Sequence, residues 1–129
     1  MKNAIVVDLR PRERVCQDAE PIATIYRNLG TTSAEQVVTR ALTELAIAMA
    51  GLAEQIRTHD LHDLARRLRS LQSMAQSLGM VSLAHVTVDL GVCIDRKDTT
   101  AFAAVWARLL RIAEKALTAE EGVVDRTIP

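Results

Sequence analysis

A row of polar and basic side chains in the middle of the chain has the chemistry to bind an anion. At 100° per residue, several positions fall within about 40° of one line over roughly 21 Å of helix; they are His62, Arg66, Arg69, Ser73 and Gln76. Each guanidinium group can grip a carboxylate or a phosphate through paired hydrogen bonds. Leu64, Leu71 and Ala75 point the other way. This helix is therefore expected to bury a leucine face and to show the polar row to solvent.

The sequence contains no motif for a metal site, a phosphate-binding loop or a catalytic nucleophile. Metal sites in helical bundles use Glu-x-x-His pairs, and none occurs. There is no glycine-rich phosphate loop, no Gly-x-Ser-x-Gly elbow and no cysteine paired with a nearby histidine. Cys16 and Cys93 have neither metal-ligand nor redox spacing and are expected to be reduced thiols. We therefore expect neither an enzyme nor a bound metal or cofactor.

The composition limits the size and the class of the fold. A chain of 129 residues fits one domain, whose folding buries roughly two-thirds of the surface of the unfolded chain. The aromatic residues are Tyr26, Phe102 and Trp106 alone, so the core must be built mainly from Leu, Ala, Val, Ile and Met, which favours helices. Sixteen acidic and sixteen basic residues give a formal net charge of zero. No global field would attract nucleic acid or an anionic membrane.

Neither a membrane span nor a secretory signal is expected. The longest uncharged apolar-rich run, residues 45–53, is far shorter than the roughly 20 residues that a span requires. The apolar run near the N-terminus, residues 4–7, is too brief for a secretory signal. The expected location is the cytoplasm.

Apolar periodicity predicts two helices in the first half of the chain. The first is short, with Pro21 in its first turn and Gly30 as its C-terminal cap. The second keeps one apolar face for about seven turns up to Arg57. Thr32 and Glu35 have the spacing of a capping box at its start.

Three more helices are expected in the second half. Asp60 would cap the third helix, and Gly79 would end it. Residues 82–94 are predicted to form the fourth helix, although part of this segment also alternates like a strand. A polar turn ending at Asp98 leads to the last helix, whose periodicity fades after Thr118.

Connections as short as these usually join helices that are antiparallel neighbours. The expected fold is therefore all-α, an up-and-down antiparallel four-helix bundle over residues 20–118 with a short additional N-terminal helix. Residues 1–19 would form an arm that contains the strand-like run of residues 4–7. Residues 119–129 would form a flexible tail.

The third predicted helix and its surroundings resemble the histidine-containing phosphotransfer (HPt) domain family. In that family the active helix has the pattern His-x-Leu-Lys-Gly-Ser/Ala and ends in Leu-Gly, and here Leu71, Leu78 and Gly79 fit. The order of elements over most of residues 20–118 is also similar, with a long helix, a turn with an aspartate, the motif helix and a final amphipathic helix. The resemblance implies a bundle that acts in two-component phosphorelay signalling.

The same resemblance places the phosphoacceptor histidine of the family at Arg69. The lysine expected three residues later is Gln72, and the glycine that makes room for the phosphoryl group and the receiver domain is Ser73. Phosphoryl transfer to nitrogen needs a lone pair, and deprotonating a guanidinium near pH 7 would cost roughly 9 kcal/mol. Arg69 is therefore excluded as a phosphoacceptor. Its guanidinium instead suits the acidic phosphorylation pocket of a receiver domain.

His62 is the other histidine that the sequence offers as an acceptor. It lies on the same line as Arg69, two turns closer to the helix start, and the two arginines that follow it could steady a phosphoryl group. However, it would lie in the first turn, lacks the Lys-Gly pair and is too far from Leu78 for the family pattern. His59 and His85 do not match the motif.

The leading hypothesis is an HPt-like protein that binds a response-regulator receiver domain or a histidine kinase without accepting phosphate. The predicted docking face consists of Arg69, Arg66, His62, Gln72, Ser73 and Gln76. One alternative is an active phosphotransfer protein that uses His62. Another is a helical scaffold or dimerisation bundle, unrelated to phosphorelay, that would form a homodimer. No nucleic-acid or membrane partner is expected.

Overall fold

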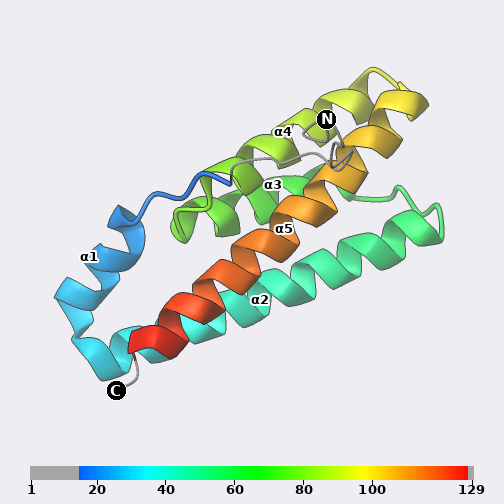
Figure 1. Cartoon of the computed structure of the whole chain (residues 1–129). Helices are drawn as coiled ribbons and strands as arrows, with labels where there is room; N and C mark the ends of the chain where they lie inside the picture. The colour runs from blue at the N-terminus through cyan, green and yellow to red at the C-terminus, as the bar shows by residue number, and fades with distance from the viewer. Residues whose placement is uncertain (1–14, 128–129) are drawn as a thin grey trace, which may run out of the picture.

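The computed structural model describes residues 15–127, with their side chains as far as residue 118. All regular elements in this part of the chain are α-helices, and they pack together as a bundle, which confirms the predicted all-α class (Figure 1). The strand-like run of residues 4–7 lies outside the described residues. The helices are α1 (Glu20–Leu29), α2 (Thr31–Arg57), α3 (Leu64–Ser77), α4 (Val81–Asp95) and α5 (Thr99–Thr127).

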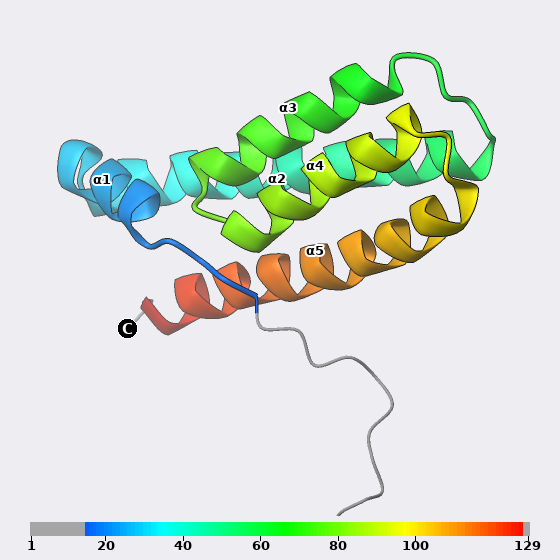
Figure 2. The same cartoon turned by 90° about the horizontal axis from the view of Figure 1, so that it is seen from above.

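The helix that carries the polar row is held from two sides. α3 packs against α2 and, more extensively, against α4, while α4 in turn packs against α5. α2 and α5 touch over only a short stretch, and α1 packs mainly on α2. From α2 onward, each helix runs back along the one before it (Figure 2). The outer side of α3 is consequently left open to solvent.

The core between these helices is aliphatic, as the composition predicts. Fully burying a leucine or isoleucine side chain contributes about 1.5 to 3 kcal/mol each. Phe102 and Trp106 are only partly buried and cover the edge of the core. The largest fully buried side chains come from α2, α3, α4, α5 and the α3–α4 turn, and include Leu45, Leu52, Leu64, Leu71, Leu78, Met80, Leu83, Leu90, Leu109 and Ile112.

The fourth predicted segment is helical throughout. α4 buries Leu83, Val86 and Leu90 at helical spacing between α3 and α5. A strand there would need a ladder partner, and the structure describes no neighbouring strand in residues 15–127. The helical prediction for this segment is confirmed.

The capping box predicted for the second helix is wrong. α2 begins one residue before Thr32, and neither Thr32 nor Glu35 caps it, because the N-cap residue is Gly30 with a φ of 77°. Gly30 serves both helices at once: its N–H donates to the Tyr26 carbonyl and its carbonyl accepts from the Ala34 N–H, both at 2.9 Å. A single glycine therefore ends α1 and starts α2.

The third helix begins later than predicted. α3 starts at Leu64, after Asp63 with a left-handed φ of 59°. The Asp60 carboxylate does not cap the helix, because its Oδ1 accepts a hydrogen bond from the His62 backbone N–H at 3.1 Å and closes a turn before it. His62 therefore lies in the loop of residues 58–63 and not in the first turn of the helix.

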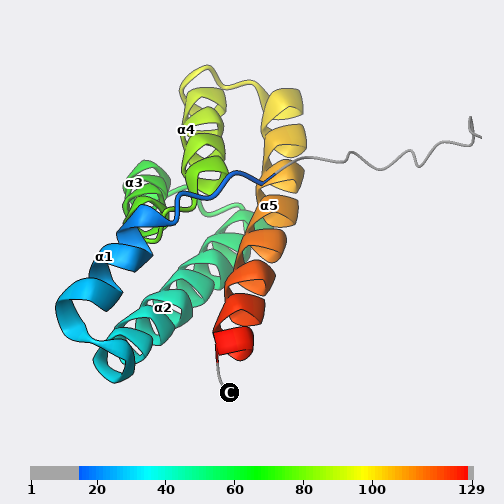
Figure 3. The ribbon, with the colours of Figure 1, turned by 60° about the vertical axis from the view of Figure 1, so that its left-hand side comes forward.

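Residues 15–18 run across the turn between α3 and α4 and bind to it (Figure 3). The Asp18 N–H donates to the Gly79 carbonyl at 2.7 Å, and the Cys16 carbonyl accepts from the Ser82 N–H at 3.3 Å. The Cys16 N–H also donates to Ser82 Oγ at 2.7 Å. We call these contacts of residues 15–18 with Gly79 and Ser82 the N-terminal clasp. Residues 1–14 of the predicted arm lie outside the described residues.

The last helix is longer than the apolar pattern indicates. The backbone of α5 is helical from Thr99 to Thr127, past the point at Thr118 where the periodicity fades. Most of the segment predicted as a flexible tail is therefore helical in its backbone, and residues 128–129 lie outside the described part.

α2 alone among the described helices is long and apolar enough to cross a membrane, by length and composition only. The core helix of a water-soluble protein passes the same test. In this structure α2 places Leu45, Met49 and Leu52 in the core of the bundle. The cytoplasmic location therefore stays a prediction.

Candidate functional site

The outer side of α3 brings together five of the six residues predicted for the docking face, all except His62. Arg66, Arg69, Ser73 and Gln76 are exposed, and Gln72 is half-buried beside them. Their spacing of three and four residues keeps them on one side of the helix. The opposite side buries Leu64, Leu68, Leu71 and Ala75.

Arg69 is the most available cation on this face. It lies in the middle of α3 and is exposed, and no hydrogen bond or ion pair joins it to any described residue. Ser70 and Ser73, the next residue and the residue one turn on, are exposed and too small to cover its side chain. An incoming carboxylate or phosphate can therefore approach the guanidinium group directly.

The start of the face carries an acidic group that the sequence analysis missed. Asp63 Oδ2 lies 3.2 Å from Arg66 Nη2 and 3.3 Å from His62 Nε2. The Arg66 side chain is 74% exposed, so this pair contributes little to stability. It does offset the charge of Arg66 and leaves the positive charge of the face centred on Arg69. The spacing of three residues between Asp63 and Arg66 is the signal that could have identified the pair.

His62 is fixed through its backbone rather than through its imidazole ring. Its carbonyl accepts a hydrogen bond from the Nε2 of Gln55, a buried residue of α2. The Oε1 of the same amide is buried and has no hydrogen-bond partner among the described residues. The His62 side chain itself is 85% exposed. Because His62 precedes the helix, the predicted alignment with Arg69 along α3 is wrong.

The Arg67 side chain lies on the side of α3 that faces α2. A Cβ atom added to Gly51 of α2 would lie 3.3 Å from Arg67 Nη1, so the guanidinium passes close over this glycine. Arg67 therefore belongs to the contact between α2 and α3 and not to the outer face.

The remaining two histidines lie apart from the outer side of α3. His59 is exposed in the α2–α3 loop with a φ of 56°, and His85 is exposed on α4. No group of three or more metal-binding side chains occurs among the described residues.

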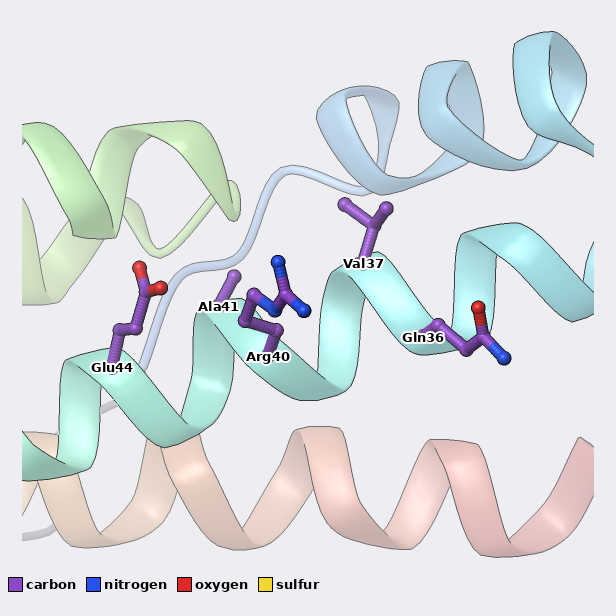
Figure 4. Close-up of a pocket in the computed structure, with 5 residues that line it drawn as sticks. All are labelled: Gln36, Val37, Arg40, Ala41 and Glu44. Carbon is purple, nitrogen blue, oxygen red and sulfur yellow. The ribbon is translucent and has the colours of Figure 1, made fainter.

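A shallow cavity of about 390 Å³ lies on α2, away from the predicted docking face. Figure 4 shows Val37, Arg40 and Glu44 projecting from the same side of the helix. Arg40 and Glu44 carry opposite charges four residues apart, so a charged ligand would meet attraction and repulsion together. This cavity therefore has no net charge to attract an ionic ligand, whereas the outer side of α3 has the exposed cation Arg69.

No protein-family model, no curated protein and no solved structure matches the chain. The resemblance to the HPt family accordingly rests on the motif residues and the helix order alone.

Proposed function

We propose that the protein is an HPt-like bundle that binds a response-regulator receiver domain, or a histidine kinase, without accepting phosphate. In this proposal α2 to α5 form the up-and-down antiparallel arrangement of four helices, and α1 is the additional N-terminal helix. The alternating helix directions in Figure 2 support it. The protein would act in the cytoplasm as part of two-component signalling.

The observation that carries the proposal is the environment of Arg69. Arg69 is exposed and has no partner among the described residues, on a helix that is packed on its other side, and the resemblance assigns the phosphoacceptor of the family to this position. Receiver domains present carboxylates, and a phosphoryl group when activated, at the site that docks on this position. Paired hydrogen bonds from the guanidinium would therefore bind these groups with defined geometry.

Binding of this kind needs no covalent step. The protein would occupy the surface of the receiver that an active phosphotransfer protein uses, or shield the phosphoaspartate from water. Ser73, in place of the family's glycine, adds little bulk beside Arg69. The polar outer side of α3 thus suits an interface in which the arginine is the central charged contact.

The test is a binding screen by calorimetry against receiver domains, each in the unphosphorylated form and in the beryllofluoride-activated form. We expect one form of at least one receiver to bind, and Arg69→Glu to weaken that binding by about tenfold or more, since reversal places like charges in contact. Arg40→Glu is the matched control, because Arg40 is an exposed arginine on α2. Equal affinities for the two variants, or no binding by any receiver, would contradict the proposal.

The alternative with His62 as an acceptor has its own readout. After incubation with a phosphorylated receiver, an active relay protein would carry acid-labile, base-stable phosphate that is lost in His62→Gln. The place of His62 in the loop, beside Asp63, disfavours this function, because a carboxylate 3.3 Å from the imidazole repels an incoming phosphoryl group.

A second candidate function is a scaffold that forms a homodimer, and one surface favours it. α4 exposes Val81, Val88 and Val92 at 38%, 46% and 40%, and His85 lies among them at helical spacing. We call these four residues the α4 valine face. A helix that is apolar on its outer side as well as its inner side usually has a partner. In a dimer, two such faces would pack against each other around a two-fold axis.

A further inference from the structure

A cleft of about 400 Å³ opens at one end of the bundle, between the α2–α3 loop and the α4–α5 turn. Figures 1 and 2 both place these two connections at the end of the molecule that is remote from α1. The volume lies within the range of roughly 300 to 1,000 Å³ that is usual for sites of small molecules. None of the residues that line the cleft belongs to the predicted docking face on α3.

The floor of the cleft is apolar and continuous with the core. Ile56, Ile94 and Phe102 are partly buried, and each packs against the core while also lining the cleft. Leu61 stands at the rim with 62% of its surface exposed, and the half-buried Cys93 also lines the cleft. An apolar ligand seated here would cover the rim leucine and the exposed parts of the floor.

Lys97 and Asp98 give the rim one positive and one negative charge, and Lys97 is the cation of the pair. Lys97 lines the cleft and forms no ion pair with any described residue. Asp98, its neighbour, is engaged in the structure, because its Oδ1 accepts the Ala101 N–H at 3.0 Å and so caps the start of α5. His59 lines the opposite connection and adds a polar ring.

The two rim residues share an uncommon backbone conformation. His59 has a φ of 56° and Lys97 a φ of 55°. Both angles lie in the left-handed region, which residues other than glycine seldom adopt. Each residue ends a helix in a Schellman motif, in which the Asp60 N–H donates to the Gln55 carbonyl after α2 and the Asp98 N–H donates to the Cys93 carbonyl after α4. Here each conformation brings a polar side chain to the mouth of an apolar cleft.

We propose that this cleft binds a small amphiphile, with its apolar body on the floor formed by Ile56, Ile94 and Phe102 and its anionic head at Lys97. The chemical class is a free medium-chain or aromatic carboxylate. The site is independent of the proposed function, because it uses a different end of the molecule from the outer side of α3.

The first test uses the full chain and the fluorescent apolar anion 8-anilinonaphthalene-1-sulfonate. We expect the protein to bind this probe in the cleft. We expect hexanoate, octanoate and decanoate to displace the probe at concentrations below those at which they form micelles. Each methylene group that enters the cleft contributes about 0.8 kcal/mol, so affinity rises roughly fourfold per added methylene. Affinity that does not depend on chain length would overturn the proposal.

Two variants separate the head from the body of the ligand. Lys97→Asn removes the charge and retains a residue that tolerates a left-handed backbone, and it weakens decanoate binding by about two- to fivefold. Arg96→Asn is the matched control, because this neighbouring cation does not line the cleft. Leu61→Ser, at an exposed position that leaves the core intact, weakens binding by about fivefold. Equal effects of Lys97→Asn and Arg96→Asn would contradict recognition of the head at Lys97.

The second test uses the reactivity of the two cysteines to show where the ligand binds. In Cys16→Ser protein, Cys93 is the remaining thiol, and saturating decanoate slows its reaction with a thiol reagent by about tenfold or more because the ligand covers it. In Cys93→Ser protein, the exposed Cys16 reacts at the same rate with and without decanoate. A lack of protection at Cys93, or equal protection of both thiols, would show that the ligand does not bind in the cleft.

Discussion

Gly79 meets two separate demands on its backbone. Its φ of 73° is left-handed, and a Cβ atom at this position would lie 1.9 Å from the Asp18 carbonyl oxygen. The first demand is visible in the sequence, because glycine after a helical pattern predicts a helix end. The second is not, because Asp18 is distant in the sequence and reaches Gly79 only through the N-terminal clasp.

We expect Gly79→Ala to destabilise the fold by about 2 kcal/mol or more. The left-handed backbone alone costs an alanine roughly 1 to 2 kcal/mol, and displacement of the Asp18 carbonyl adds to it. Urea unfolding followed by the fluorescence of Trp106, the single tryptophan, measures the loss.

Gly91→Ala is the matched control for this substitution. Gly91 lies within α4, and a Cβ atom there meets nothing within 4 Å, so alanine is neutral or stabilising by about 0.5 to 1 kcal/mol. If Gly79→Ala unfolded at the same urea concentration as the wild-type protein, the clasp would not hold the chain against Gly79 in solution.

Part of the candidate site could be predicted at the level of single residues. Arg66, Arg69 and Gln76 lie on the exposed side of α3 because leucines at helical spacing determine which side is buried. His62 was misplaced because the start of α3 depends on the left-handed backbone of Asp63, which periodicity does not reveal. Lys97 was missed for a related reason, since a lysine in a turn carries no signal that an apolar cleft lies beside it.

At the scale of elements, α1 is the least anchored helix. It has no fully buried residue, and Ile22 is its side chain that packs against the core. One surface ion pair joins its two ends, because Arg27 donates hydrogen bonds to Glu20 and to Thr24. The hydrogen bond from Arg27, and then its charge, lower the pKa of Glu20 below its usual value of 4.5. Few apolar contacts and exposed polar bonds are the features of segments that open locally.

We expect α1 to open on acidification before the rest of the bundle. A carboxylate whose pKa is lower in the folded state stabilises that state above its unfolded pKa, and this stability is lost as the pH falls through the folded pKa. The contribution of Glu20 is therefore fully present above pH 4.5 and is lost progressively as the pH falls from there through the lower pKa of the folded state. Tyr26, the single tyrosine, reports on α1 by NMR, while Trp106 reports on α5.

Glu20→Gln should remove this part of the pH dependence at Tyr26. Glu54→Gln is the control, because the hydrogen bond from Arg57 likewise lowers the pKa of Glu54, but at the C-terminal end of α2. If Glu20→Gln and wild-type protein showed the same Tyr26 titration between pH 3 and pH 6, the ion pair would not contribute to the stability of α1.

The segments of the bundle were predictable, whereas their exact ends were not. The helical segments follow from apolar positions such as Leu52, Leu71 and Leu90, which the structure buries. Helix starts depend instead on a few backbone angles. The N-cap of α2 is Gly30 and not the predicted Thr32, because the backbone angles at this position suit glycine alone.

At the scale of the whole molecule, the mass in solution separates the two proposed functions. The scaffold function predicts a dimer with twice the chain mass of 14.2 kDa, and Val88→Glu in the α4 valine face would convert it to a monomer. The docking function predicts a monomer for the wild-type protein and for the variant. Light scattering after gel filtration at micromolar concentration measures the mass.

Ile47→Glu is the control for this comparison, because Ile47 is an exposed β-branched residue on α2. A dimer that both variants disrupt equally would contradict association through the α4 valine face. Truncation of the N-terminus, as a test for an exchanged arm, should remove residues 1–14 only. Removal of residues 15–18 would also delete the clasp.

The clasp also sets an order of events during protein synthesis. It joins Cys16 to Ser82, which is 66 residues later in the chain, whereas α2, α3 and α4 each pack against the helix that follows them. At ordinary rates of translation those 66 residues take roughly 3 to 13 seconds to follow. Residues 15–18 therefore leave the ribosome well before the residues that they bind, and Val15 stays uncovered until the chain has reached α4. A nascent chain of this protein thus offers its N-terminal segment to chaperones for as long as its binding site is still being made.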